Sequence, residues 1–291
     1  MPTTENSMQP KHIANAIAQL GQGLGPEVIT QVNQLFAEQQ QQLVNKVPAL
    51  ATDLAYGSHP RNQLDIYGPK DCQGPCPVVL WVHGGGFIRG DKGSDEHWPN
   101  TNVGRTLAQH NIVTAVMNYR LAPDNTWPSG SEDIAQALAW LAENIHQYGG
   151  DKNRIILAGT SAGAVHASGY LRLAGDKPTV HGVVLMSGLY GYTPLDDRDH
   201  YYYGDESTYG QRCPKEAVEA TELPLLVTCS QYDPTRFQTE FNALLQARLK
   251  RFGTMPRALI MPGHNHYSMP YHLGTSDKRL EMELVAFVSA I

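Results

Sequence analysis

The pentapeptide Gly159-Thr160-Ser161-Ala162-Gly163 constrains the fold of this chain more than any other segment. It directly follows the apolar run 154–158, so a serine with small neighbours lies where a strand should turn sharply into a helix. Such a turn strains the serine backbone, and a side chain at either flanking glycine would collide with the neighbouring strand or helix. Because G-x-S-x-G is short enough to occur by chance, it predicts a nucleophilic serine only together with its context.

A second motif, His83-Gly84-Gly85-Gly86-Phe87, follows the apolar run 77–82, which is typical of a buried strand. Three consecutive glycines favour neither helix nor strand. The segment can be a flexible loop, or its N–H groups can approach a ligand and stabilise an oxyanion, which typically contributes about 3 to 4 kcal/mol. In the second interpretation the donors are Gly85, Gly86 and the residue after the serine, Ala162.

The two motifs together resemble those of the hormone-sensitive-lipase-like esterases in the α/β-hydrolase superfamily. Leu64-Asp65-Ile66-Tyr67-Gly68-Pro69, Asn118-Tyr119-Arg120-Leu121-Ala122-Pro123 and Gly149-Gly150-Asp151 resemble the same group in the same order, so the similarity covers roughly residues 50 to 291. The resemblance is to the branch of small bacterial esterases and kynurenine-formamidase-like proteins. It implies an α/β fold with a mostly parallel eight-stranded sheet, helices on both faces and a small cap, and ester hydrolysis as the default activity.

Composition agrees with one α/β domain carrying a small appendage, because 291 residues suffice for a large core. The 22 Lys and Arg against 28 Asp and Glu give a formal charge of −6 without basic clusters, which disfavours nucleic acid or an anionic membrane surface as partner. A small neutral substrate fits better. We find neither a secretory signal nor a run long enough to span a bilayer, and therefore expect a cytoplasmic protein.

No metal or cofactor is expected from the cysteines and histidines. Four irregularly spaced cysteines make no zinc pattern, and Cys229 is expected to be a buried inert thiol in a strand. For Cys72 and Cys76 the sequence leaves two alternatives open, a disulfide that bridges a loop and two free thiols. His264, His266 and His272 are near in sequence, but no carboxylate or cysteine lies among them at the usual ligand spacing.

Short apolar runs alternating with amphipathic stretches predict a mostly parallel sheet covered on both faces. The clearest helices are expected over 131–147 and 236–251. The strands are expected over 53–56, 64–67, 78–82, 112–117, 154–158, 180–186, 223–229 and 258–261.

Two segments are candidate covers for a pocket in the catalytic domain, 51–291. Residues 1–50 form a helical segment, which is either simply packed on the domain or part of a lid. The insertion 189–222 holds six of the fourteen tyrosines, which either cover the sheet edge or form an aromatic wall facing substrate. Because both covers look polar and aromatic rather than aliphatic, we expect short acyl groups, with aryl alcohols as candidate leaving groups.

A serine nucleophile needs a base and a carboxylate, which in this fold should follow in the order Ser, acid, His at the ends of later strands. Asp233 fits because it directly follows the strand 223–229, whereas its rivals Asp196, Asp197, Asp199 and Asp205 lie in the insertion. His264 and His266 both follow the last strand. His266 aligns with the catalytic histidine of the family that the chain resembles, and His264 is expected to be a loop or pocket residue.

The remaining expectations concern neighbouring side chains. His83 should brace the glycine loop, and Arg120 and Asp133 should form a structural pair. Candidate substrate-binding residues are Phe87, Tyr190 and Tyr267. The sequence thus predicts a serine carboxylesterase that acts through an acyl-enzyme. The alternatives are a formamidase or arylamidase with the same triad and, remotely, a non-catalytic binding protein on this fold.

Overall fold

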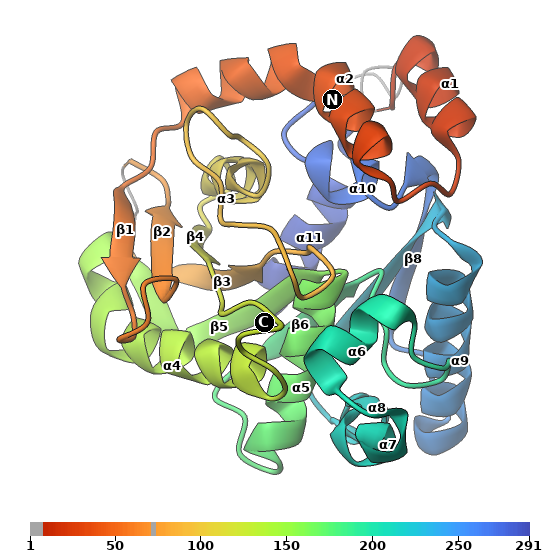
Figure 1. Ribbon diagram of the computed structural model, residues 1–291. Coiled ribbons are helices and arrows are strands. Elements are labelled where there is room, and N and C mark those ends of the chain that lie inside the picture. Colours follow the sequence, from red (N-terminus) through yellow and green to blue (C-terminus); the bar gives the residue numbers. More distant parts are fainter. Residues whose placement is uncertain (1–7, 71–73) are drawn as a thin grey trace.

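The computed structural model describes residues 8–70 and 74–291, and its centre is an eight-stranded sheet in the order β1-β2-β4-β3-β5-β6-β7-β8 (Figure 1). β1 pairs antiparallel with β2 and β2 antiparallel with β4, while the other neighbours are parallel. The strands are β1 (Ala51–Ala55), β2 (Gln63–Tyr67), β3 (Cys76–Val82), β4 (Val113–Met117), β5 (Gly150–Thr160), β6 (Gly182–Met186), β7 (Leu225–Tyr232) and β8 (Arg257–Asn265).

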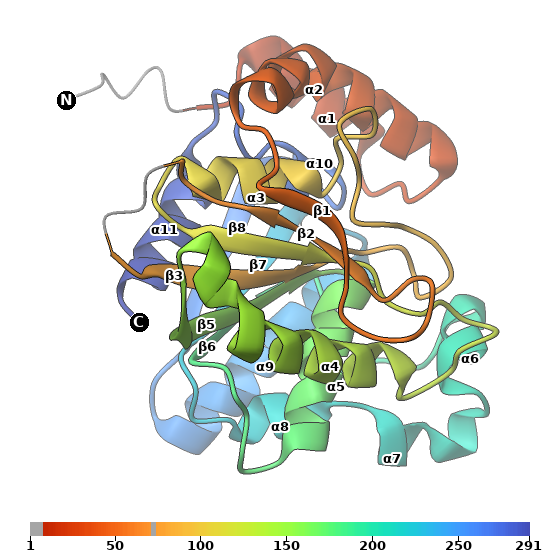
Figure 2. The same cartoon turned by 90° about the vertical axis from the view of Figure 1, so that its left-hand side faces the viewer.

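Helices cover both faces of the sheet (Figure 2). One face packs against α3 (Thr101–Ala108) and α11 (Arg279–Ser289), and the other against α4 (Ser129–Asn144), α5 (Ala162–Ala174) and α9 (Thr235–Phe252). Successive residues of a strand point to opposite faces, so each central strand supplies both cores. In β3, for example, Val78, Leu80 and Val82 enter one core and Val79 and Trp81 the other.

The N-terminal segment forms two helices, α1 (Lys11–Leu20) and α2 (Pro26–Lys46), where the sequence predicted one helical segment. Pro26 opens α2, a position where the missing N–H costs nothing. Both helices bury apolar side chains in a shared cluster with Tyr267 and Tyr271, which lie beyond the end of β8. In Figure 1 these helices lie above α10 (Ser268–Tyr271).

The insertion 189–222 is folded rather than an irregular loop. It contains α6 (Asp197–Tyr203), the 3₁₀ turn η3 (Glu206–Thr208), α7 (Tyr209–Arg212) and α8 (Lys215–Ala220). Tyr202, Tyr203 and Tyr209 are buried in one cluster with Phe87. Packing therefore explains most of the tyrosine-rich composition.

All eight predicted strands are present, and the two predicted helices correspond to α4, which the 3₁₀ turn η2 (Ile145–Tyr148) follows, and α9. Cys229 is buried in β7 as expected, whereas the question of a bridge from Cys76 falls on Cys72, which lies outside the described residues. Within 8–70 and 74–291, no helix combines the length and apolar character needed to cross a bilayer.

Candidate active site

Ser161 occupies the sharp turn between β5 and α5. Its φ of 53° and ψ of −122° lie outside the regions that non-glycine residues usually adopt. A side chain on Gly163 would overlap the carbonyl oxygen of Val82, and one on Gly159 would come within 2.5 Å of the Gly163 backbone. The predicted need for both glycines is confirmed, and the turn presents Ser161 at the carboxyl edge of the sheet.

Asp233 and His266 are brought together from the ends of two neighbouring strands, β7 and β8. Nδ1 of His266 lies 2.7 Å from Oδ1 of Asp233. The other carboxylate oxygen, Oδ2, accepts hydrogen bonds from the Ser187 hydroxyl at 2.5 Å and from the Ser230 N–H at 2.6 Å. This network fixes the carboxylate, and the carboxylate in turn orients the imidazole.

The electrostatics of Asp233 favour an ionised carboxylate. Burial alone would raise its pKa, but the hydrogen bond and charge of His266, together with the donors Ser187 and Ser230, lower the pKa below the ordinary value. Cys229 Sγ also lies 3.2 Å from Oδ2, and burial followed by the charge of Asp233 raises the pKa of this thiol. Cys229 therefore remains a neutral thiol beside the carboxylate.

The rival acids have other partners. Asp196 and Asp199 both pair with Arg236, at 2.8 and 2.6 Å. Asp205 is exposed and accepts the Ser207 N–H at 2.8 Å. The structure thus places Asp233, and none of these three residues, against His266.

His264 belongs to a buried network behind the loop that carries His266. Its Nδ1 lies 3.1 Å from the Ser268 hydroxyl and its Nε2 lies 3.2 Å from Oδ2 of Asp277. The His272 ring lies 4.0 Å from the His264 ring between centroids, tilted by 33°. Burial followed by the charge of His264 lowers the pKa of His272 to about 3. His264 is therefore a structural residue and does not line the pocket.

Among the described residues, only this network groups side chains closely enough to hold a metal ion. Ligand atoms of His264, His272 and Asp277 lie within 4.8 Å of one another. Sequence spacing offered no carboxylate for these histidines, but the fold brings Asp277, which lies just before α11, to His264 and His272. However, Arg279 donates to both carboxylate oxygens, at 2.9 Å from Nε to Oδ1 and 2.5 Å from Nη2 to Oδ2. A guanidinium already balances this charge, so the network stabilises the loop.

The glycine loop is held open by its backbone conformation. Gly85 has φ of 133° and Gly86 φ of 58°, and a side chain on Gly85 would overlap the carbonyl group of Arg89. His83 braces the loop as predicted: Nδ1 lies 2.6 Å from the Gly84 carbonyl oxygen, and the ring stacks on Tyr119. Burial lowers the pKa of His83 to about 4, so this ring is neutral at neutral pH.

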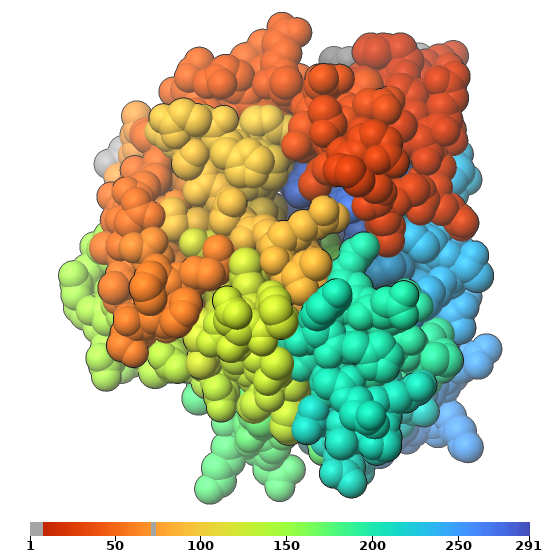
Figure 3. All heavy atoms as spheres, in the orientation of Figure 1, coloured from red at the N-terminus to blue at the C-terminus, as the bar shows by residue number. Residues whose placement is uncertain are grey.

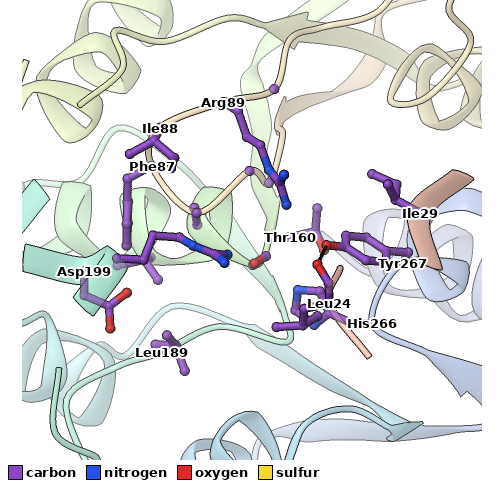
Figure 4. Close-up of a pocket in the computed structure, with 18 of the residues that line it drawn as sticks. Leu24, Ile29, Phe87, Ile88, Arg89, Thr160, Leu189, Asp199, His266 and Tyr267 are labelled. Atoms are coloured by element: carbon purple, nitrogen blue, oxygen red, sulfur yellow. Dashed lines mark hydrogen bonds between the residues drawn. The ribbon is translucent and has the colours of Figure 1, made fainter. Parts of the chain in front are cut away.

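A pocket of about 890 Å³ contains Ser161, Ala162, His266 and the glycines 84–86. Figure 3 shows the surface hollowed where the N-terminal helices (red) meet the region of α6 (teal). Leu24 and Ile29 contribute to the lining from the N-terminal side. The close-up in Figure 4 places them near Tyr267, whose hydroxyl donates to the Leu24 carbonyl oxygen at 2.8 Å.

Of the predicted substrate-binding residues, Phe87 and Tyr267 line this pocket and Tyr190 does not. Tyr190 is 1 % exposed and belongs to the core between the sheet and α5. The chain turns after β6 at Ser187, whose φ is 45°. The alternating side-chain directions of a strand do not continue through such a turn, so the sequence could not reveal where Tyr190 points. Among the six tyrosines of the insertion, only Tyr201 lines the pocket, so the aromatic-wall alternative is wrong for the other five.

Sequence reasoning missed three groups that shape the site. Ser187 donates to Asp233, and its place after β6 at the carboxyl edge is the signal that could have revealed it. Arg89 and Arg198 line the pocket from the loop after the glycines and from α6. Neither arginine belongs to a motif, so their convergence depends on the folded insertion.

Comparison with known proteins places the fold among known ones. Residues 64–181 match the family model BD-FAE. A solved structure described as a bacterial heroin esterase superposes with a TM-score of 0.69 at 24 % identity, covering 99 % of both chains. The chain has the α/β-hydrolase fold. The fold class predicted from sequence is thereby confirmed.

Two further relatives extend the comparison of this α/β-hydrolase. Esterase B from Lactobacillus rhamnosis, solved with a tributyrin phosphonate inhibitor, has a TM-score of 0.69 at 21 % identity and covers 91 % of this chain and 96 % of its own. A probable isoprenylcysteine alpha-carbonyl methylesterase of Arabidopsis thaliana is 38 % identical over 249 residues. That alignment covers 75 % of this chain and 51 % of the relative, so the chain spans about half the length of this curated relative. The resemblance to esterases of the superfamily is confirmed.

Proposed function

We propose that this α/β-hydrolase is a serine carboxylesterase acting on small-molecule esters. The observation that carries the proposal is the opening of Ser161 and His266 into one pocket, with His266 oriented by the buried Asp233 at 2.7 Å. In the part of the chain that the structure describes, the Ser161 hydroxyl and the His266 ring form no hydrogen bond with each other. Such contacts are often long before substrate binds and tighten in the complex. The ester-hydrolase names of the relatives support the same activity.

The mechanism follows from the placement of these groups. His266 accepts the proton of Ser161 as the oxygen attacks the ester carbonyl carbon, and Asp233 stays ionised and stabilises the imidazolium. The N–H groups of Gly85, Gly86 and Ala162 are the proposed donors to the oxyanion, and all three residues line the pocket. His266 then protonates the leaving alcohol. Water repeats the cycle on the acyl-enzyme and releases the acid.

We further propose that the N-terminal helices and the 189–222 insertion act together as a small cap. Leu24 and Ile29 contribute from the first, and Leu189, Leu195 and Tyr201 from the second. Four of these five side chains are aliphatic, whereas the sequence suggested covers that are mainly polar and aromatic. Apolar contacts from two sides would bury the acyl or alcohol group of a bound ester.

Short acyl groups remain the proposed substrates, because charged side chains interrupt the apolar lining. Arg89, Asp91, Arg198 and Arg236 face the same pocket as the aliphatic residues. Each buried CH₂ of an acyl chain yields about 0.8 kcal/mol only where an apolar wall receives it. A long chain would have to pass these charges, and its added methylenes would gain little.

The test is hydrolysis of p-nitrophenyl esters of increasing acyl length by the wild type and by Ser161→Ala. We expect kcat/KM to be highest between acetyl and hexanoyl, and the alanine variant to lose activity by several orders of magnitude because only binding and oxyanion stabilisation remain. Full activity in the variant would overturn the serine mechanism. A preference for dodecanoyl esters would leave the mechanism intact and overturn the short-chain proposal.

A further inference from the structure

Two arginines converge on the pocket of the candidate nucleophile from different parts of the chain. Arg89 follows the glycine loop, and Arg198 lies in α6 of the insertion. Both line the same cavity as Ser161 and His266. Figure 4 shows Arg89 pointing from its loop into the pocket, toward the side on which Tyr267 lies.

Neither guanidinium forms an ion pair in the part of the chain that the structure describes. Among the ion pairs of residues 8–70 and 74–291, none includes Arg89 or Arg198. The third arginine of the pocket, Arg236, gives the internal contrast, since it contacts Asp196 at 2.8 Å and Asp199 at 2.6 Å. Arg236 thus has two carboxylate partners, whereas Arg89 and Arg198 have no ion-pair partner among the described residues.

The carboxylates that line the pocket do not pair with Arg89 or Arg198. Asp196 and Asp199 are committed to Arg236, and the Asp91 carboxylate accepts the Gly93 N–H at 2.8 Å. Asp197 is exposed in the first turn of α6. No carboxylate of the described pocket lining therefore forms an ion pair with Arg89 or Arg198.

Both arginines line the pocket that contains Ser161 and His266. A side chain on Gly86 would come within 2.5 Å of Cδ and 3.1 Å of Nη1 of Arg198, so this arginine packs directly against the glycine loop. Burial raises the pKa of Tyr267, and the charges of Arg89 and Arg198 act in the opposite direction. The charges of both guanidinium groups thus act on one side chain that lines the pocket, Tyr267.

We propose that the pocket binds esters that carry a second, anionic group, with Arg89 and Arg198 holding the anion while the ester lies at Ser161. Guanidinium groups match the oxygens of carboxylate and phosphate, and such charge-assisted hydrogen bonds are stronger than neutral ones. The inference rests on the proposed esterase function and narrows its substrate class. The natural substrate would then be an acidic ester, and hydrolysis would release a product that retains the anion.

The first test compares two acetyl esters of nearly equal shape, 4-acetoxybenzoate and its neutral amide, 4-acetoxybenzamide. A 4-acetoxyphenyl phosphate arm distinguishes a phosphate preference from a carboxylate preference. We expect the wild type to favour an anionic ester over the amide by at least about tenfold in kcat/KM, since charge-assisted hydrogen bonds are stronger than neutral ones. Salt should reduce this ratio through screening.

The variants Arg89→Gln and Arg198→Gln should each lower the anionic-to-neutral ratio by about tenfold. The matched control is Arg251→Gln, an exposed arginine at the other end of α9 from the pocket, which should keep the wild-type ratio. A wild-type ratio near one that neither pocket variant changes would overturn the subsite while leaving the esterase proposal in place.

A binding measurement separates the subsite from turnover. Calorimetry on Ser161→Ala with 4-acetoxybenzoate should show binding that is weakened about tenfold when Arg89→Gln or Arg198→Gln is added. If the wild type cleaves no ester but this arginine-dependent binding is present, the esterase proposal fails and the anion subsite stands. Absence of arginine-dependent binding overturns the subsite whatever the turnover.

Discussion

Nδ1 of His266 lies 2.7 Å from Oδ1 of Asp233, and each residue directly follows the last residue of a strand, β8 and β7. The two side chains meet because parallel strands end at the same edge of the sheet. In the proposed mechanism this contact sets the tautomer that leaves Nε2 free to accept a proton. A substitution of Asp233 that disrupts this contact is therefore the first test of the mechanism.

Asp233→Asn should keep the protein folded and lower kcat by a factor on the order of 10⁴, the loss seen when the corresponding carboxylate of serine proteases is changed. The amide can donate to Nδ1 and thereby favour the wrong tautomer. Steady-state kinetics with circular dichroism checks both parts. Asp205→Asn, an exposed acid of the insertion, is the control and should resemble the wild type. Near-normal activity in Asp233→Asn would transfer the acid role to another residue.

The two histidines after β8 should respond differently. His266→Ala should abolish turnover because no base remains, whereas His264→Ala should leave a measurable rate because His264 contacts Ser268 and Asp277 rather than the pocket. The His264 variant should instead unfold at a lower urea concentration, since it leaves buried partners unsatisfied. Loss of activity in a stably folded His264→Ala with retention in His266→Ala would reverse the assignment.

Gly85→Ala should lower kcat by about 10² to 10³, the loss typical for removal of one oxyanion donor. The added methyl would overlap the Arg89 carbonyl group, and φ of 133° is unfavourable for alanine, so the loop must move. Gly210→Ala is the matched control, because Gly210 lies in α7 with no atom within 4 Å of the added methyl. Equal rates for the two variants would show that the loop conformation does not matter for catalysis.

Asp277→Asn should lower the free energy of unfolding at neutral pH by about 3 kcal/mol, because Arg279 and His264 lose a buried charged partner. Burial would raise the pKa of Asp277, but hydrogen bonds from Arg279 and His264 lower it far below the ordinary value. Because its pKa is lower in the folded protein, the Asp277 carboxylate stabilises the fold at pH values above about 3.9, the pKa of an aspartate in the unfolded chain. This stabilisation is lost as the pH falls below that value.

The difference between wild type and Asp277→Asn in urea unfolding should therefore shrink below about pH 4. Asp176→Asn, an exposed position, is the control and should show no such difference. A difference that stays constant on acidification would contradict the ionic contribution of Asp277.

Patterns within short stretches of the sequence sufficed to predict the strands and the residues that follow two of them. Apolar runs bounded by turns marked all eight strands, and Ser161 and Asp233 could be identified as residues that follow β5 and β7. The choice of His266 over His264 after β8 came from the resemblance to a known family. The strand order, in which β4 lies between β2 and β3, was not predicted, since nothing in the runs themselves encodes it.

The errors concern side-chain directions and long-range partners. Tyr190 enters the core because of the turn at Ser187. Asp277 contacts His264 from the segment between α10 and α11, thirteen residues further along the chain. The convergence of Arg89 and Arg198 likewise requires the insertion to fold over the glycine loop. Periodicity reports which face of an element is apolar, but it does not report which distant element will meet that face.

The central claim, that Ser161 is the nucleophile of an ester hydrolase, is tested most directly by labelling the protein with an organophosphate. Peptide mass spectrometry should find the phosphoryl adduct on Ser161 alone, with activity lost in proportion to labelling, and Ser161→Ala should remain unlabelled. An adduct on a different serine, combined with retained esterase activity in Ser161→Ala, would contradict the claim.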